Sequence, residues 1–298
     1  MSMQEVDRRR FLGGALMAGA AMVLPRAVGA EEEGKPVTGW EPDLALSSVM
    51  FHRLSLEAFC ETAAKLGFKA IDLWGPFRRC RHMFEAVGMG PEAFSKMLGQ
   101  YGLRIGVWTH YAGGEKRRGF PEFAEFIGAC GGGTVVRGAE YGEVPKDKHE
   151  DAIKAFYGKL GPEIELARKH KVRLAVENHS SSLLDGEQSF EWFTQHNPAP
   201  DVVGFAIAPY HLQKRKVDVP ALIAKHAAQT LFFYAWQLAE GAKELPGHGP
   251  TDFKPWMQAL AHAGYHHPIT PFTHGDLQPA EMAAAVATSV TYLKDLKL

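Results

Sequence analysis

Short apolar segments alternate with longer helical patterns from residue 44 to the end of the chain, and this alternation constrains the fold most. Strands that alternate with helices indicate parallel βαβ units. The expected strands lie at residues 44–51, 70–74, 104–109, 134–137, 172–177, 202–206, 230–236 and 268–273. The expected helices follow them at residues 55–66, 91–101, 121–129, 148–170, 186–196, 220–226, 252–263 and 279–296.

Eight such repeats favour a closed (β/α)₈ barrel over an open doubly wound sheet. The chain has 298 residues, and a barrel of this kind needs about 250. No Gly-x-Gly-x-x-Gly turn follows the first expected strand, so a dinucleotide-binding fold has little support. We therefore predict an α/β protein with one (β/α)₈ (TIM) barrel over residues 44–298.

The first thirty residues have the pattern of a removable export signal. Arg8-Arg9-Arg10-Phe11-Leu12 fits Arg-Arg-x-Phe-Leu, an apolar run continues to Leu24, and Val28-Gly29-Ala30 offers small residues for cleavage. Because the run is short and rich in glycine, the alternative of a membrane anchor is disfavoured. Twin-arginine signals are addresses read by a receptor. We predict a twin-arginine signal over residues 1–30, a flexible leader over residues 31–43, and a periplasmic or otherwise extracytoplasmic mature protein.

The charge of the mature chain argues against nucleic acid as a partner. The signal contains four arginines and two acidic residues, which leaves 29 basic and 32 acidic residues in the remaining 268. A protein that follows a phosphate backbone needs a basic excess. The same acidic balance argues against a DNA-cleaving barrel enzyme. Three widely spaced cysteines form no disulfide framework.

Barrel enzymes place their chemistry at the carboxyl ends of the strands and on the loops that follow. Histidines recur there, and neutral imidazole is a common ligand of transition metals. The polar and aromatic residues expected at this end are His52, Trp74, His82, His110, Glu177, Asn178, His179, His211, Gln237, His248 and His274. Arg78, Arg79 and Arg81 follow the second strand, where solvated surface is the favoured interpretation and contact with an anionic substrate the alternative.

Several of these segments resemble the xylose isomerase-like barrels of the sugar phosphate isomerase/epimerase superfamily. The similar segments are Val172-Arg173-Leu174-Ala175-Val176-Glu177-Asn178-His179, Leu66-Gly67-Phe68-Lys69-Ala70-Ile71-Asp72-Leu73-Trp74-Gly75, Gly204-Phe205-Ala206-Ile207-Ala208-Pro209-Tyr210-His211 and Pro246-Gly247-His248-Gly249-Pro250-Thr251-Asp252-Phe253. The resemblance implies one divalent cation held by a glutamate, an aspartate, a histidine and a second glutamate from strands five to eight. It also implies proton transfer between neighbouring carbons of a sugar by carboxylates.

This chain matches only the first of those four ligands. Glu177 stands at the strand-five position, whereas Ala208 occupies the aspartate position, the seventh strand has no histidine, and Phe272 lies in an eighth strand without glutamate. With Glu177 as the only expected carboxylate, the usual two-carboxylate proton shuttle is absent from its expected positions. The sequence therefore leaves two interpretations open.

In the favoured interpretation, Glu177, His211, Gln237 and His274 form a rebuilt metal site. Its nitrogen-rich ligands favour manganese, zinc, cobalt or iron over magnesium. Glu177, His110 and His179 are then the expected catalytic residues, with His110 or His179 as base, and Trp74, His82, Asn178 and His248 are expected to bind substrate. The enzyme would isomerise or epimerise a carbohydrate or keto-sugar, or cleave a keto-glycoside as a metal-dependent lyase or hydrolase. In the other interpretation the metal is lost, and the barrel binds sugars without catalysis or does metal-free acid/base chemistry.

Overall fold

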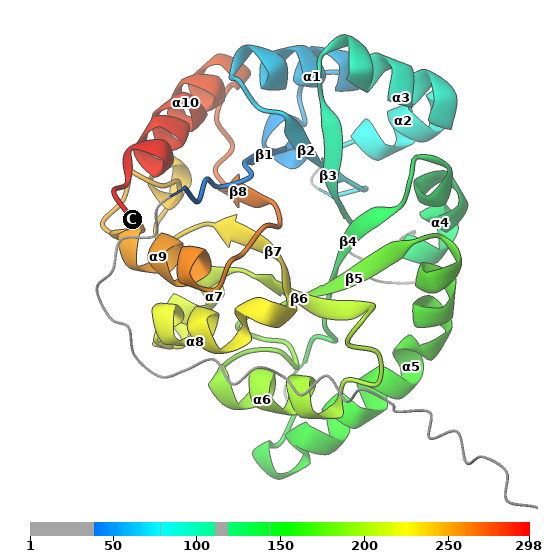
Figure 1. The fold of residues 1–298 in the computed structure, drawn as a ribbon, viewed down its shortest axis with the longest axis vertical. Coiled ribbons are helices and arrows are strands. Elements are labelled where there is room, and N and C mark those ends of the chain that lie inside the picture. The colour runs from blue at the N-terminus through cyan, green and yellow to red at the C-terminus, as the bar shows by residue number, and fades with distance from the viewer. Residues whose placement is uncertain (1–38, 78, 111–118, 143) are drawn as a thin grey trace, which may run out of the picture. The chain divides into compact units, whose positions relative to one another are not determined.

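Eight parallel strands lie side by side in chain order, each hydrogen-bonded to the next (Figure 1). The structure is a computed structural model that describes residues 39–77, 79–110, 119–142 and 144–298. The strands are β1 (Ala45–Ser47), β2 (Ala70–Trp74), β3 (Arg104–Thr109), β4 (Gly133–Gly138), β5 (Val172–Glu177), β6 (Val203–Ile207), β7 (Thr230–Ala235) and β8 (Ile269–Pro271). Leu44 forms a parallel bridge with Ile269, which brings the two ends of the sheet together. The predicted (β/α)₈ barrel is confirmed.

Helices surround this barrel, as Figure 1 shows. They are α1 (Leu56–Lys65), α2 (His82–Met89), α3 (Pro91–Gln100), α4 (Phe120–Ala129), α5 (His149–Lys169), α6 (Glu187–His196), α7 (Pro209–Lys214), α8 (Val219–His226), α9 (Lys254–His262) and α10 (Pro279–Asp295). Short 3₁₀ helices occur at η1 (Ser48–Phe51), η2 (Lys146–Lys148), η3 (Ala227–Gln229) and η4 (Gly241–Glu244).

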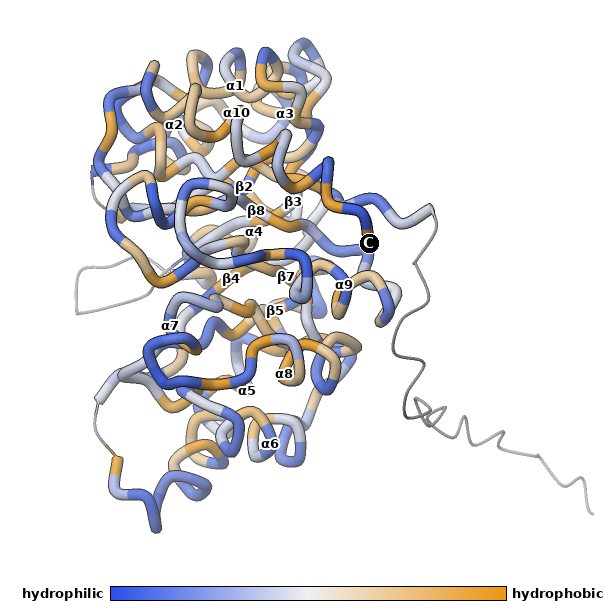
Figure 2. Tube along the Cα trace, turned by 90° about the vertical axis from the view of Figure 1, so that its left-hand side faces the viewer, coloured by the Kyte–Doolittle hydropathy of each residue, from blue (hydrophilic) through white to orange (hydrophobic). Residues whose placement is uncertain are grey.

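Local sequence explains why these elements form where they do. The Ser55 hydroxyl accepts a hydrogen bond from the Ala58 amide (3.2 Å), which caps α1 at its first turn. The strands are almost entirely buried, because helices cover their outer face and side chains fill the barrel. Along the helices, hydrophilic and hydrophobic residues alternate, as expected for helices with one side on a barrel (Figure 2).

The structure differs from the sequence-based expectation at three elements. The first strand ends at Ser47, and the chain turns into η1, where the Ser48 hydroxyl accepts a hydrogen bond from the Trp74 amide (2.9 Å). Helices α2 and α7 stand where loops were expected. Both are short, with eight and six residues, so their periodic pattern is too brief to recognise in the sequence.

The described part of the expected leader is bonded to the barrel. The Trp40 indole donates to the Tyr265 carbonyl oxygen (2.7 Å), and Asp43 forms an ion pair with Arg104. The Ile269 amide donates to the Asp43 carbonyl oxygen (2.9 Å). The expected signal and residues 31–38 lie outside the described residues. Among the described residues, no helix combines the length and apolar character needed to cross a bilayer.

Candidate active site at the carboxyl ends of the strands

Glu177 is the last residue of β5 and lies in register with Gly138 of β4 and Ala206 of β6. Only 6% of it is exposed, and burial raises the pKa of its carboxyl well above the usual value. The Tyr234 hydroxyl from β7 lowers this pKa and the Asp72 carboxyl raises it, but burial is the larger cause. Burial therefore favours the neutral, protonated form of Glu177.

Asp72 of β2 is a second carboxyl in the barrel interior, and the sequence analysis gave it no role. It accepts hydrogen bonds from the hydroxyls of Ser47 (2.8 Å) and Thr109 (2.6 Å) and from the indole of Trp74 (2.5 Å). Burial nevertheless raises its pKa to about 7, against the lowering effect of these three donors. This corrects the expectation that Glu177 is the only carboxyl of the site. The available signal was an aspartate inside the apolar strand Ala-Ile-Asp-Leu-Trp, because unpaired buried carboxyls are rare.

Trp74, Tyr234, Trp236 and Phe272 form an aromatic cluster, which contacts Asp72 through the Trp74 indole and affects the pKa of Glu177 through the Tyr234 hydroxyl. Trp74 is 1% exposed and stacks on Phe272, with ring centroids 5.6 Å apart and an interplanar angle of 13°. Tyr234 and Trp236 meet the same phenyl ring edge-on, at 5.0 and 5.2 Å. The Tyr234 hydroxyl is buried and makes no well-directed hydrogen bond with a described residue. The expected role of Trp74 in binding substrate does not fit this burial, whereas the half-buried Tyr210, stacked on Trp236 at 4.2 Å, does offer an accessible aromatic face.

His179 and His211, here called the histidine pair, follow β5 and β6. Their ring centroids are 3.8 Å apart. Burial lowers both pKa values, that of His211 to about 2, and the positive charge of Lys214 lowers them further. The Ser181 amide donates to Nδ1 of His179 (3.3 Å). Both imidazoles are therefore neutral at neutral pH, which leaves ring nitrogens able to accept protons or hydrogen bonds.

His110 lies at the end of β3 and is 1% exposed. Neither ring nitrogen has a hydrogen-bond partner among the described residues. Gly75 leaves room for this ring, since a Cβ atom there would lie 2.7 Å from Nδ1 of His110. Burial lowers the pKa of His110 to about 3. Its expected role as base does not fit this value, because a base of so low a pKa is weak at neutral pH. A neutral donor to a substrate oxygen fits better.

The expected metal ligands do not come together in the described residues. No group of three or more histidine, cysteine, aspartate or glutamate side chains there is placed to hold a metal ion. The imidazoles of His211 and His274 both pack edge-on against Trp236, at 5.2 and 4.8 Å, where an indole occupies the space beside each ring. The residues present therefore do not fit the predicted site of Glu177, His211, Gln237 and His274.

Gln237 has a different task in this structure. Its amide nitrogen donates to the Leu245 carbonyl oxygen (2.9 Å), and its side-chain oxygen accepts from the Thr251 amide (2.8 Å). Both ends of the side chain are thus engaged with the loop after β7, so the oxygen is not presented to a metal. Gly249 lies so close that a Cβ atom there would be 2.6 Å from the Gln237 amide.

Glu244 of η4 is a buried carboxylate that the sequence analysis did not single out. It accepts hydrogen bonds from the Trp236 indole (3.0 Å), the Thr273 hydroxyl (2.9 Å) and the His274 amide (2.6 Å). It thereby joins the loop after β7 to the residues after β8. Its position in a loop, outside any strand pattern, hid it from sequence reasoning.

Three residues expected to bind substrate bond instead to the protein itself. His82 is fully buried and contacts the Leu54 carbonyl oxygen through Nε2 (2.9 Å). The Asn178 side chain forms two hydrogen bonds with the backbone of Ala208. Its oxygen accepts from the Ala208 N–H (2.7 Å), and its nitrogen donates to the Ala208 carbonyl oxygen (3.1 Å). His248 contacts the Ala285 carbonyl oxygen of α10 (2.9 Å). These placements do not fit direct substrate contact.

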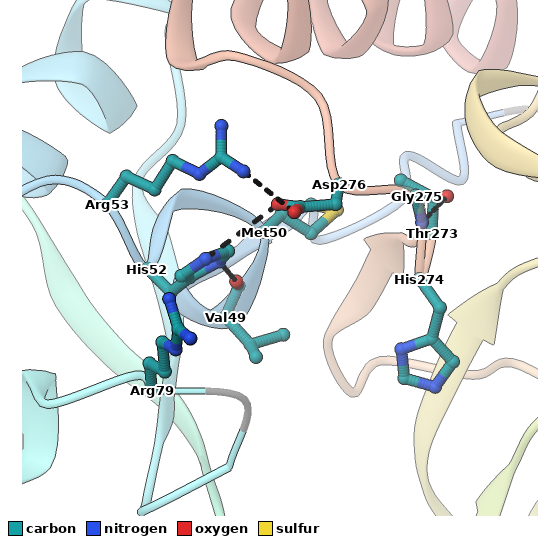
Figure 3. Close-up of a pocket in the computed structure, with 9 residues that line it drawn as sticks. All are labelled: Val49, Met50, His52, Arg53, Arg79, Thr273, His274, Gly275 and Asp276. Atoms are coloured by element: carbon teal, nitrogen blue, oxygen red, sulfur yellow. Dashed lines mark hydrogen bonds and ion pairs between the residues drawn. The ribbon is translucent and has the colours of Figure 1, made fainter.

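A pocket of about 670 Å³ adjoins this region, between the residues after β1, β2 and β8. Figure 3 shows His52, Arg53 and Arg79 on one side and Thr273 and His274 on the other. The His274 ring also packs on Phe272 at 5.0 Å. The pocket is therefore continuous with the aromatic cluster through His274.

The fold and the placement of these groups define a (β/α)₈ barrel with its candidate site at the carboxyl ends of the strands. Residues 60–296 match the family described as xylose isomerase-like TIM barrel, and the chain belongs to that family. Comparison with curated proteins gives no match.

Solved structures of similar fold include three of known description. The IolI protein with a bound zinc atom is 13% identical, with a TM-score of 0.68, over 86% of this chain and 99% of that one. The 3-keto-D-glucoside 4-epimerase YcjR from E. coli is 14% identical, with a TM-score of 0.68, over 85% and 99%. The probable 3-DHS dehydratase AsbF from Bacillus anthracis is 14% identical, with a TM-score of 0.65, over 84% and 98%. At these identities the likeness shows the fold alone.

Proposed function

We propose that this protein is a sugar-acting enzyme that moves a proton next to a carbonyl group, as isomerases, epimerases and some lyases do. The observation that carries the proposal is the buried carboxyl of Glu177 at the end of β5, followed two residues later by His179, whose ring centroid lies 3.8 Å from that of His211. Family membership and the names of the similar structures, two of which are an epimerase and a dehydratase, support the same reaction class.

In this proposal Glu177 acts as the acid. A carboxylic acid kept neutral by burial can donate a hydrogen bond to the oxygen of a substrate carbonyl, which stabilises the negative charge that develops there. Asp72 lies near enough to raise the pKa of Glu177 and so helps to keep the proton on it. His110, neutral and without a partner among the described residues, supplies a second donor to substrate oxygen.

His179 of the histidine pair acts as the base. It receives the proton from the carbon next to the carbonyl and returns it to the neighbouring carbon. The half-buried Tyr210 ring, which stacks on the buried Trp236, offers an aromatic face for a sugar ring close to His211, whose ring centroid lies 5.2 Å from that of either aromatic residue.

The test is exchange of substrate hydrogen for deuterium, followed by NMR in D₂O with a panel of keto-sugars and keto-glycosides. Chelator-treated protein is expected to exchange the hydrogen next to the carbonyl, and Glu177→Gln to slow this exchange by about 10²-fold or more. Glu187→Gln is the matched control, because Glu187 is an exposed carboxylate on α6. Exchange that requires an added divalent metal would favour the rebuilt metal site instead, and equal exchange in both variants would contradict the role of Glu177.

A non-catalytic sugar-binding barrel is the second candidate. The observation that favours it is the burial of both carboxyls, since Glu177 is 6% and Asp72 0% exposed. This candidate predicts saturable binding of sugars in calorimetry together with no exchange for any of them.

A further inference from the structure

The pocket beside β1 and β8 contains more positive than negative charge. Arg53 and Arg79 carry two guanidinium groups, and Asp276 is the one carboxylate that lines the pocket. Asp276 contacts two residues that follow β1. Its carboxylate accepts a hydrogen bond from the Arg53 guanidinium (2.7 Å), and its Oδ1 atom lies 3.8 Å from Nε2 of His52. The single carboxylate thus balances Arg53.

Among the described residues that line the pocket, no carboxylate pairs with Arg79. Within the described residues it forms neither a hydrogen bond nor an ion pair, and Figure 3 shows its side chain extending toward the His52 ring. Its backbone has a φ of 68°, a left-handed conformation that is uncommon for residues other than glycine. Such conformations persist only where surrounding structure maintains them, and they gather at ligand-binding sites.

The pocket is next to the proposed reaction site. Thr273 and His274 line it, and both are held by Glu244, which also binds the Trp236 indole. A small molecule bound at the Tyr210 ring and reaching His274 would enter the pocket, because His274 lines it. The guanidinium of Arg79 is suited to a planar oxyanion, since its fork of donors can bind two oxygens at once.

We propose that this pocket binds the oxyanion group of an acidic sugar, a carboxylate or a phosphate ester, through Arg79 and His52. The orientation of the sugar ring toward Glu177 rests on the proposed function, whereas the binding of the anion does not. Asp276 competes with the ligand for the same positive charges, so its negative charge sets the affinity.

Isothermal titration calorimetry of the whole protein tests this proposal with four probes: glucuronate, glucose 6-phosphate, glucose and inorganic phosphate. Glucuronate or glucose 6-phosphate is expected to bind at least tenfold more tightly than glucose, with an affinity that falls as salt rises. Tighter binding of glucuronate would identify the carboxylate as the preferred group, and tighter binding of glucose 6-phosphate would identify the phosphate. Inorganic phosphate shows whether the anion binds without the sugar.

Three variants distinguish this site from general attraction of anions. Arg79→Gln is expected to weaken binding of the acidic sugar about tenfold and to leave glucose unchanged. Arg81→Gln is the matched control, because Arg81 is an exposed arginine of the same loop that does not line the pocket, and it is expected to bind as the unaltered protein does. Asp276→Asn is expected to tighten binding, because it releases Arg53 and removes the competing charge.

The proposal is overturned if Arg79→Gln and Arg81→Gln weaken binding equally, if Asp276→Asn weakens it, or if no acidic probe binds better than glucose. Because calorimetry needs no turnover, anion binding without hydrogen exchange would reject the proposed function and keep this site. Hydrogen exchange with neutral sugars, without tighter binding of acidic sugars, would support the proposed function and reject the anion site.

Discussion

At the scale of single residues, the proposed chemistry of this barrel depends on carboxyls whose pKa values are raised by burial. Asp72 accepts three hydrogen bonds and would favour the charged form if hydrogen bonding decided its state. Burial has the larger effect, and its pKa rises to about 7. Burial has the same effect on Glu177. A pair of nearby buried acids is stable only while at least one holds its proton.

Asp72→Asn is expected to change how stability depends on pH. The folded carboxyl holds its proton to about pH 7, against a usual pKa of 3.8, so the unfolded chain binds fewer protons between these values. The free energy of unfolding therefore falls as pH rises through this window, by up to roughly 4 kcal/mol. Asp72→Asn removes this fall, and urea unfolding between pH 4 and 7.5 measures it.

The control for that experiment is Asp147→Asn, since Asp147 is exposed in η2. The free energy of unfolding of this variant is expected to depend on pH in the same way as that of the unaltered protein. If Asp72→Asn also runs parallel across the whole window, the pKa of Asp72 is not raised on folding.

At the scale of elements, the loops after the strands are held by buried polar side chains rather than by secondary structure. Gln237 fastens the loop after β7 through its amide, and Asn178 fastens the start of α7 to the end of β5. Glu244 connects the residues after β7 and β8, so the position of the Trp236 indole and of His274 depends on one carboxylate.

Glu244→Ala is expected to lower the free energy of unfolding by about 2–4 kcal/mol, because three buried donors lose their acceptor. Glu244→Gln retains one acceptor oxygen and is expected to lose less. Chemical denaturation measures both. Glu240→Ala, at an exposed glutamate four residues earlier, serves as reference, and a loss at Glu244 no larger than this one would contradict the role of Glu244.

At the scale of the whole molecule, the barrel closes through the first residues that the structure describes. Leu44 pairs with Ile269, and Asp43 contacts both Ile269 and Arg104, so the barrel needs the segment directly before β1. We propose that the residues before it direct export through the twin-arginine route and that the mature protein acts outside the cytoplasm. The Arg-Arg-x-Phe-Leu pattern at residues 8–12 supports this proposal.

The double substitution Arg8→Lys with Arg9→Lys is expected to stop export, because the receptor reads the arginine pair. Cell fractionation follows the protein, and mass spectrometry of the exported form is expected to find Glu31 at its amino terminus. Arg10→Lys changes the variable position of the pattern and is expected to leave export intact. Equal export of the double variant, or an exported chain that retains residues 1–30, would contradict the signal.

The sequence by itself determined the barrel and the place of Glu177. Periodicity and turn residues are local properties, and β5 reads as a strand ending in Glu177 without reference to any other segment. The histidines at the strand ends were likewise placed correctly at the carboxyl end of the barrel, since parallel strands bring those ends together.

Only the tertiary structure decided what those residues contact. That Asp72 lies near Glu177, that Trp236 packs against both His211 and His274, and that the Gln237 amide is engaged with its own loop all depend on side chains from distant segments. Whether a polar side chain is free for substrate or satisfied by the protein is a question of partners and burial. Partners and burial are set when distant strands assemble, so a local pattern of residues does not predict them.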